Sequence, residues 1–233
     1  TAYNAAGVVN MPLVEDVLSM RLVGYRRDSG GYIDNTHFNL EDINANVTSG
    51  GKFMLKYDPS DRVSILATAI LQRSDQSSTN QFMPKQGFLS TVHEVKENMD
   101  DELDLYNLMA NIAVGDSADL VLTASLFERD LYREFAAEPI ERFAFGNLSG
   151  FSCARRAGLS FPAQRCNSEQ MAAHVEALGL FMPSSGEQPM QMKMVSYEAR
   201  LSSNWDARWN YTVGVFYQTR DFDLTSNIPG HDA

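Results

Sequence analysis

The side chains that suggest metal or acid–base chemistry in this sequence are a short run of acids and four histidines. The acids lie in residues 98–104, NMDDELD, and clustered carboxylates are typical calcium ligands. The run lacks the glycine and distal glutamate of an EF-hand loop, so we interpret it as a solvated acidic segment at the base of a loop. The histidines are scattered: His37, His93, His174 and His231. We expect each to be an exposed polar residue, and no metal ion to be held by side chains.

Enzymatic motifs are absent. The sequence contains no G-x-S-x-G, no H-E-x-x-H, no phosphate-binding loop and no dinucleotide fingerprint. Glu198 and Arg200 are separated by one residue, so in a strand they share a face and form an ion pair. We interpret this pair as structural, and we expect a protein that is not an enzyme and has no cofactor.

The composition and charge of the sequence limit the classes of partner that the protein could bind. The 233 residues are 44% hydrophobic and carry 19 Lys and Arg against 30 Asp and Glu, a net charge of -11. No basic stripe exists to neutralise phosphates, which argues against nucleic acid. The sequence contains no run of 18 apolar residues, so it predicts no transmembrane helix, and only a closed barrel would span a bilayer. The first residues lack a signal-peptide pattern, and both ends suggest a piece of a longer chain.

The clearest element is a hairpin at residues 195–220. Val195, Tyr197 and Leu201 alternate with polar residues, and the alternation resumes from Trp209 to Arg220 after a short turn. Tyrosine and tryptophan gather toward the strand ends, as at a membrane–water interface. An ordinary soluble hairpin with aromatic cross-strand pairs is the alternative.

Eight such strand segments follow one another, joined by connections that alternate between short and long. Short turns are predicted at 11–16, 58–61, 115–119 and 205–208, and long loops at 28–49, 73–101 and 131–191, the last with a helix at 168–180 whose N-cap is Ser168. Outer-membrane barrels have this segregation of loop lengths, and strands of about ten residues suit a tilted crossing. The pattern predicts an all-β, antiparallel, up-and-down transmembrane β-barrel, partial in this sequence, with its apolar parity on one outer surface.

Several stretches resemble successive barrel segments of TonB-dependent outer-membrane receptors. They are GVVNMPLVEDVLSMRLVGYRRDSGGYIDN, SGGKFMLKYDPSDRVSILATAILQRSD, ADLVLTASLFERD and VSYEARLSSNWDARWNYTVGVFYQTRDF. The most specific parts are the N-x-P-L pattern from Asn10 with Arg21, the loop start GYIDN from Gly31, and Y-E-x-R-L-x-S from Tyr197. The resemblance covers nearly the whole chain outside the long loops.

This resemblance implies a barrel of about 22 strands in the outer membrane of a Gram-negative bacterium, plugged by an N-terminal domain and energised through TonB. Residues 1–233 would then be part of one receptor barrel domain, with the plug absent. The implied function is import of a siderophore-bound iron, a cobalamin or a sugar. A small eight-stranded structural or porin-like outer-membrane barrel is the alternative, and a soluble carbohydrate-binding sandwich is the third. Outer-membrane lipid and lipopolysaccharide are expected partners, the latter with divalent bridging at the acidic run as a minor alternative.

In such a barrel the polar parity faces the lumen and supplies candidate ligand contacts. The candidates are Arg21, Lys52, Lys56, Asn107, Asn111, Arg129, Glu198, Arg200 and Gln218. Solvating the lumen or contacting the plug is the other interpretation of each. Several Arg and Lys on an acidic chain predict a locally cationic lumen. That lumen favours an anionic metal chelate such as a ferric siderophore, with iron carried inside the ligand.

The two cysteines, Cys153 and Cys166, lie in the longest loop with twelve residues between them. An extracellular loop is an oxidising environment, so we predict a disulfide that stabilises the loop by about 3 kcal/mol. Two free thiols are the alternative. A metal site is disfavoured because no paired histidine or second cysteine set lies nearby.

Overall fold

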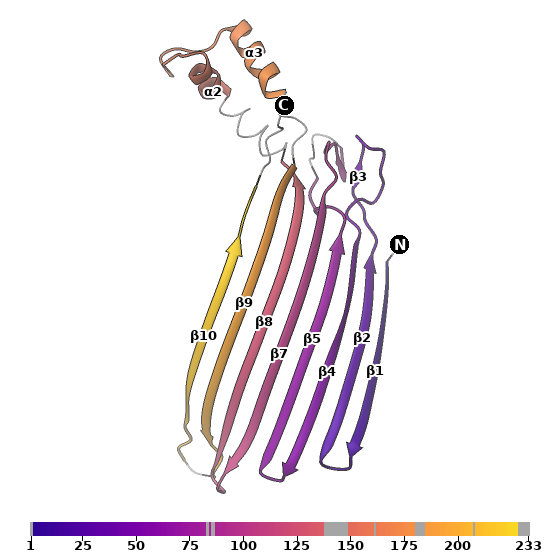
Figure 1. The fold of residues 1–233 in the computed structure, drawn as a ribbon, viewed down its shortest axis with the longest axis vertical. Coiled ribbons are helices and arrows are strands. Elements are labelled where there is room, and N and C mark those ends of the chain that lie inside the picture. The colour runs from indigo at the N-terminus through magenta and orange to yellow at the C-terminus, as the bar shows by residue number, and fades with distance from the viewer. Residues whose placement is uncertain are drawn as a thin grey trace.

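The computed structural model describes residues 2–82, 84, 87–137, 149–160, 162–179, 185–206 and 208–227, and it is dominated by one antiparallel β-sheet (Figure 1). Each long strand hydrogen-bonds to the strands before and after it along the chain. The strands are β1 (Tyr3–Val14), β2 (Leu18–Ser29), β4 (Asn46–Ser60), β5 (Val63–Gln76), β7 (Asn98–Val114), β8 (Ala118–Ala136), β9 (Ser185–Ser203) and β10 (Thr212–Leu224). β1 and β10 lie at opposite ends of this order. The sheet is an open section of an up-and-down barrel, which confirms the predicted fold class.

The connections alternate between short and long, as the sequence predicted. Turns at 15–17, 61–62 and 115–117 and the short connection from β9 to β10 lie at one end of the sheet. The long connections and two helices lie at the other end (Figure 1). Gly115 adopts a φ of 65° in its turn, a conformation that glycine reaches without a steric penalty. All long loops therefore meet at one end of the sheet.

Three predicted turns were too long. β8 already begins at Ala118, inside the turn predicted at 115–119. β1 continues through Pro12 to Val14, and β4 continues through Pro59 to Ser60. In both places the register shifts, between Pro12 and Val14 and between Tyr57 and Ser60. Proline lacks a backbone N–H but is tolerated at such irregularities and on edge strands. The strands are 12 to 19 residues long, longer than the predicted ten.

The two faces of the sheet differ in kind. Residues opposite each other in an antiparallel pair point to the same side, and one register row contains Leu22, Phe53, Ala69, Tyr106, Leu126 and Val195. We call the face of this row the outer face. The apolar residues for which the sequence predicted one surface all follow its alternation: Phe53, Leu55, Val63, Ile65, Leu108, Ala110, Ile112, Leu122, Ala124, Tyr197, Ala199, Leu201, Val213 and Val215, with Tyr211 just before β10.

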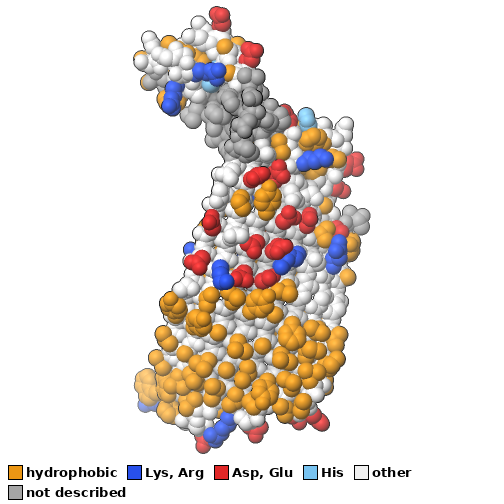
Figure 2. All heavy atoms as spheres, in the orientation of Figure 1, with side chains coloured by type: hydrophobic (Ala, Val, Ile, Leu, Met, Phe, Trp, Pro, Cys, Tyr) orange, Lys and Arg blue, Asp and Glu red, His pale blue; other side chains and the backbone are white. Residues whose placement is uncertain are grey.

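Figure 2 shows this outer face. Hydrophobic side chains cover the part nearer the short turns, and charged side chains form a band above them. Many of these apolar side chains are open to the surroundings, among them Leu108, with 52% of its surface exposed. An apolar surface this extensive on a single-layer sheet is not stable against water. None of the described helices is both long and apolar enough to cross a membrane.

Most of the buried side chains lie in the outer loops, and the buried side chains of the eight-stranded sheet are Gln76 of β5 and Ala118, Phe135 and Ala136 of β8. β3 (Asp34–Asn35) pairs in parallel with β6 (Ser90–Thr91), which joins the loop after β2 to the loop after β5. Ile33 and Thr91 in these loops are fully buried. The connection from β8 to β9 carries α2 (Ser149–Arg156) and α3 (Ser168–Gly179). α3 confirms the helix predicted from spacing, whereas the short α2 was not predicted.

Candidate functional site

All nine residues predicted to face the lumen lie on the face opposite the outer face, which we call the inner face. Strand alternation places them there: Arg21 lies between Met20 and Leu22 of the outer face, and the others follow the same rule. The set is Arg21, Lys52, Lys56, Asn107, Asn111, Arg129, Glu198, Arg200 and Gln218. Their contact with a ligand stays a prediction.

One register row of the inner face crosses all eight strands. It contains Asn10, Arg21, Met54, Thr68, Asn107, Ser125, Ser196 and Gln218. Asn107 Nδ2 donates a hydrogen bond to Ser125 Oγ at 2.7 Å. We call this row the polar row. Three candidates share it, but with strands about 4.8 Å apart, Arg21 and Gln218 each lie about 14 Å along the sheet from Asn107. The candidates therefore form a wall rather than a compact pocket.

Three inner-face cations are neutralised by neighbouring acids. Arg129 makes a bidentate pair with Asp101, at 2.8 Å from Nε and 2.7 Å from Nη2. Lys56 Nζ lies 2.8 Å from an Asp58 oxygen.

Arg200 Nη1 lies 3.7 Å from Glu198 Oε1, which is the ion pair expected from their spacing. Arg21 and Lys52 have no ion-pair partner among the residues that the structure describes.

The acidic run at 98–104 is strand, and the interpretation of it as a loop base was wrong. It forms the start of β7, so its side chains alternate between the two faces. Asp101 points to the inner face with Arg129, whereas Glu102 and Asp104 point outward and pair with Arg73. Pairing with β5 and β8 satisfies the backbone here, and these ion pairs offset the charge that disfavours a strand.

Charge is distributed unequally between the two faces of the strands. The inner face carries eight basic and four acidic side chains: Arg21, Arg27, Lys52, Lys56, Arg129, Arg133, Arg200 and Arg220 against Asp58, Asp101, Asp119 and Glu198. The outer face carries three basic and eleven acidic side chains: Arg26, Arg73 and Lys193 against Asp28, Asp75, Asp100, Glu102, Asp104, Glu128, Asp130, Glu134, Glu187, Asp221 and Asp223. The inner face is therefore net positive on a chain whose net charge is -11.

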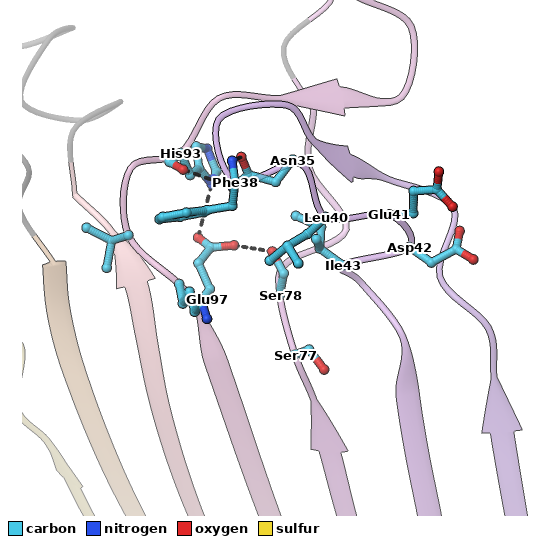
Figure 3. A pocket seen from close by; sticks show the side chains of 12 residues that line it. Asn35, Phe38, Leu40, Glu41, Asp42, Ile43, Ser77, Ser78, His93 and Glu97 are labelled. Atoms are coloured by element: carbon cyan, nitrogen blue, oxygen red, sulfur yellow. Dashed lines mark hydrogen bonds and ion pairs between the residues drawn. The ribbon is translucent and has the colours of Figure 1, made fainter.

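A buried carboxylate ties the outer loops to the sheet (Figure 3). Glu97 accepts hydrogen bonds from Ser78 Oγ, from Thr79 N at 3.2 Å and from Ala136 N at 3.1 Å. His93 Nδ1 lies 3.6 Å from Glu97 Oε1. Burial raises the pKa of Glu97, but the bonds from His93, Ser78 and the two backbone amides outweigh it and lower this pKa to about 2.

Beside Glu97 the two loops enclose a cavity of about 280 Å³. Phe38, Leu40 and Ile43 of the first loop line it together with Ser78 and His93 of the second (Figure 3). Both carboxylate oxygens of Glu97 accept hydrogen bonds, from Ser78 and Thr79 of a loop and from Ala136 at the end of β8, so they hold the loop against the sheet.

For two of the four histidines, the expectation of an exposed side chain was wrong. The side chain of His93 is 12% exposed and His174 is 5% exposed, so neither is an exposed polar residue. Loop packing that the sequence pattern does not reveal buries both. His37 is exposed, as expected, and His231 lies outside the described residues.

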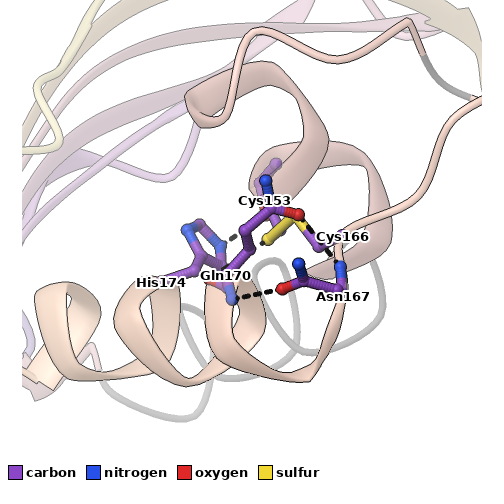
Figure 4. The surroundings of a disulfide bond; sticks show 6 residues. Cys153, Cys166, Asn167, Gln170 and His174 are labelled. Atoms are coloured by element: carbon purple, nitrogen blue, oxygen red, sulfur yellow. Dashed lines mark hydrogen bonds between the residues drawn. A yellow bond between two sulfur atoms is a disulfide. The ribbon is translucent and has the colours of Figure 1, made fainter.

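The two helices form a cross-linked hairpin (Figure 4). Cys153 in α2 and Cys166 before α3 are joined by a disulfide, with Cα atoms 6.2 Å apart. Asn167 and Gln170 exchange side-chain bonds to each other's backbone N–H, at 2.8 and 3.0 Å, a capping box that makes Asn167 rather than Ser168 the N-cap. His174 Nε2 lies 2.9 Å from Ser152 Oγ.

Comparison with known proteins shows a likeness in structure and none in sequence. No protein-family model matches the chain, and no curated protein matches its sequence. The structure is similar to the crystal structure of the ferric yersiniabactin uptake receptor FyuA from Yersinia pestis, with a TM-score of 0.69 and 14% identity. The match covers 99% of this chain and 30% of that chain. The eight strands share the fold of part of that receptor. At this identity the likeness concerns the fold alone.

Several inner-face residues were missing from the sequence-based set. Arg27 and Arg220 follow the inner parity of strands that were predicted, so alternation alone would have found them. Arg133 and Met190 lie in segments that were predicted as loop. Their strands continue because β8 and β9 stay paired from Ala118 to Ala136, and only the register reveals this extension.

Proposed function

We propose that residues 1–233 form part of the barrel of one TonB-dependent receptor, which imports a metal chelate across the outer membrane of a Gram-negative bacterium. The plug and the segment that contacts TonB would belong to sequence outside these residues. In this proposal the protein binds and releases its cargo and performs no enzymatic chemistry.

The outer face supports a membrane position. On β7 the outer-face residues from Tyr106 to Val114 are apolar. At about 3.3 Å per residue and a tilt of about 40°, they span about 20 Å, close to the apolar band of outer-membrane barrels. The next row of the outer face toward the long loops holds Asp104, Glu128 and Lys193. Lipid would contact the apolar band, and lipopolysaccharide head groups would contact the charged row.

The charge of the inner face carries the proposal of an anionic cargo. Arg21, Lys52 and Arg220 have no ion-pair partner among the described residues, so their positive charge is available to a ligand. A cationic wall raises the local concentration of anions and steers them inward. A neutral sugar or cobalamin would gain nothing from this charge. An anionic ferric chelate is therefore the favoured cargo.

Uptake by whole cells tests this function. The full-length receptor is produced in a Gram-negative strain that lacks its own ferric-chelate receptors, and cells are given radioactive iron as ferric citrate or ferric 2,3-dihydroxybenzoate. We expect iron to accumulate from at least one complex, and accumulation to stop when TonB is deleted. Accumulation of an oligosaccharide but of neither iron complex would overturn the choice of cargo. Uptake that persists without TonB would overturn the receptor class.

A further inference from the structure

On strands β7 to β10 the inner face changes from polar to apolar between the polar row and the long loops. The next row toward the long loops contains Leu105, Phe127 and Met194. The row beyond it brings Met192 opposite Phe222, and Met190 follows on the same side of β9. We call these six residues the methionine patch. They make an apolar surface on a face that is polar at lower heights.

The outer face at the same height excludes lipid as the reason for this apolar surface. Asp104, Glu128 and Lys193 occupy the register row directly behind the patch, and Lys193 Nζ lies 2.7 Å from Glu128 Oε1. Charged side chains of this density require water or polar head groups. The polarity of the sheet is therefore inverted here, with its charge outside and its apolar surface inside.

The patch is available to a partner. Phe222 has 52% of its surface exposed, and the three methionines are partly exposed. α2 and α3 pack against each other and make no extensive contact with β8, β9 or β10. An apolar inner surface open to water favours an apolar occupant.

A cation stands at the edge of the patch. Arg220 lies directly opposite Met194 on the inner face and has no ion-pair partner among the described residues. Arg129, which lies opposite Met192, is already neutralised by Asp101. The patch therefore offers one free guanidinium beside three flexible thioethers and the phenyl rings of Phe127 and Phe222.

We propose that the methionine patch binds the aromatic part of an anionic metal chelate, while Arg220 binds its negative charge. This inference rests on the proposed uptake function and names the class of cargo. Methionine side chains adapt to irregular ligand shapes, and their sulfur atoms make favourable contacts with aromatic rings. A guanidinium pairs with carboxylate or phenolate oxygens. An aliphatic anionic chelate would use Arg220 without the patch.

Binding of two iron complexes to the full-length receptor tests the inference. Ferric 2,3-dihydroxybenzoate is anionic and aromatic, and ferric citrate is anionic and aliphatic. Affinities are measured by quenching of intrinsic fluorescence in detergent, for the wild type and the double variant Met192→Gln/Met194→Gln. We expect the double variant to weaken binding of the aromatic complex by about tenfold or more, because two thioether contacts are lost, and to change binding of the citrate complex by less than about twofold. Arg220→Gln should weaken both complexes by about tenfold.

Met109→Gln is the matched control, because Met109 lies on the same inner face below the polar row. It should leave both affinities unchanged. Equal weakening of both complexes by the double variant, or no weakening of either, overturns the aromatic preference while the uptake function stands. A wild-type receptor that binds neither complex overturns both proposals.

A second measurement identifies the occupant of the patch. Met192→Cys is treated in intact cells with a charged thiol reagent that does not cross membranes. We expect labelling without iron complex and at least about fivefold slower labelling with saturating ferric 2,3-dihydroxybenzoate. A cysteine that is inert in the absence of any complex would show that another part of the protein covers the patch, and this would overturn the proposal.

Discussion

Two halves of the same strands show opposite polarity. Toward the short turns, Leu108 and Tyr197 point outward and Asn107 and Ser196 point inward. Toward the long loops, Glu128 points outward and Phe127 inward. The strands are continuous through both halves, so pairing alone does not distinguish them. The difference shows that the polarity of each face is set residue by residue along a strand. In the proposed membrane position, lipid would contact the apolar half of the outer face, and water or head groups would contact the charged half.

The largest effect is expected where a charge enters the apolar half of the outer face. Leu108→Arg should destabilise the full-length receptor in lipid vesicles by about 2–4 kcal/mol, because the side chain lies inside the apolar band, next to its middle residue Ala110 on the same face. Urea titration of the receptor folded into vesicles measures this. Asn107→Arg, one residue away on the inner face, is the control and should cost less than about 1 kcal/mol. Equal costs at the two positions would remove the distinction between the faces.

The outer loops should respond to acid in a way that the strands do not. Glu97 has a pKa lowered to about 2 from a usual value of 4.5, so its stabilisation of the loops is present above pH 4.5 and lost as the pH falls toward 2. The shift corresponds to about 3 kcal/mol. Hydrogen exchange of residues 77–82 and 87–97, corrected for intrinsic rates, should therefore accelerate between pH 5 and about pH 3.

Glu97→Gln is the variant that isolates this effect. It should already loosen these loops at pH 7 and remove most of their acid response, because the charge that held the hydrogen bonds is gone. Exchange in β5 and β7 should not change. A variant whose loops keep the wild-type acid response would assign that response to other carboxylates.

The inner and outer ion pairs of the upper half should differ in strength. Asp101→Asn breaks the bidentate pair with Arg129. The Asp101 side chain is 17% exposed and that of Arg129 is 34% exposed, so the change should lower the free energy of unfolding by about 1–2 kcal/mol in the same urea titration. Asp104→Asn is the outer counterpart, and its partner Arg73 is 46% exposed, so the cost should stay below about 1 kcal/mol. A larger cost at Asp104 would reverse the comparison.

The smallest effect is expected for the inner pair of the lower half. Glu198 and Arg200 are 39% and 49% exposed and 3.7 Å apart. Glu198→Gln should change the free energy of unfolding by less than about 0.5 kcal/mol, because water screens the pair. A double-mutant cycle with Arg200→Gln measures their coupling. Coupling above about 1 kcal/mol would place this pair in drier surroundings than its exposure indicates.

The sequence by itself determined the alternation, the order of the strands and the end at which the long loops gather. Phe53, Leu108 and Tyr197 were assigned to one surface correctly because side chains in a strand alternate with a period of two. The nine lumen candidates were placed on one face for the same reason. Alternation is a local property, so it can be read without knowledge of which strand lies beside which.

Only the tertiary structure decided where the strands end and which residues meet across them. Residues 98–104 were interpreted as loop because of their charge, yet pairing with β5 and β8 extends them into strand and gives Asp101 a partner in Arg129. The burial of His93 and His174 likewise comes from contacts between segments distant in sequence. His93 lies against the loop that carries Asn35, and His174 of α3 contacts Ser152 of α2. The methionine patch depends on cross-strand register, a non-local property that single-sequence patterns do not contain.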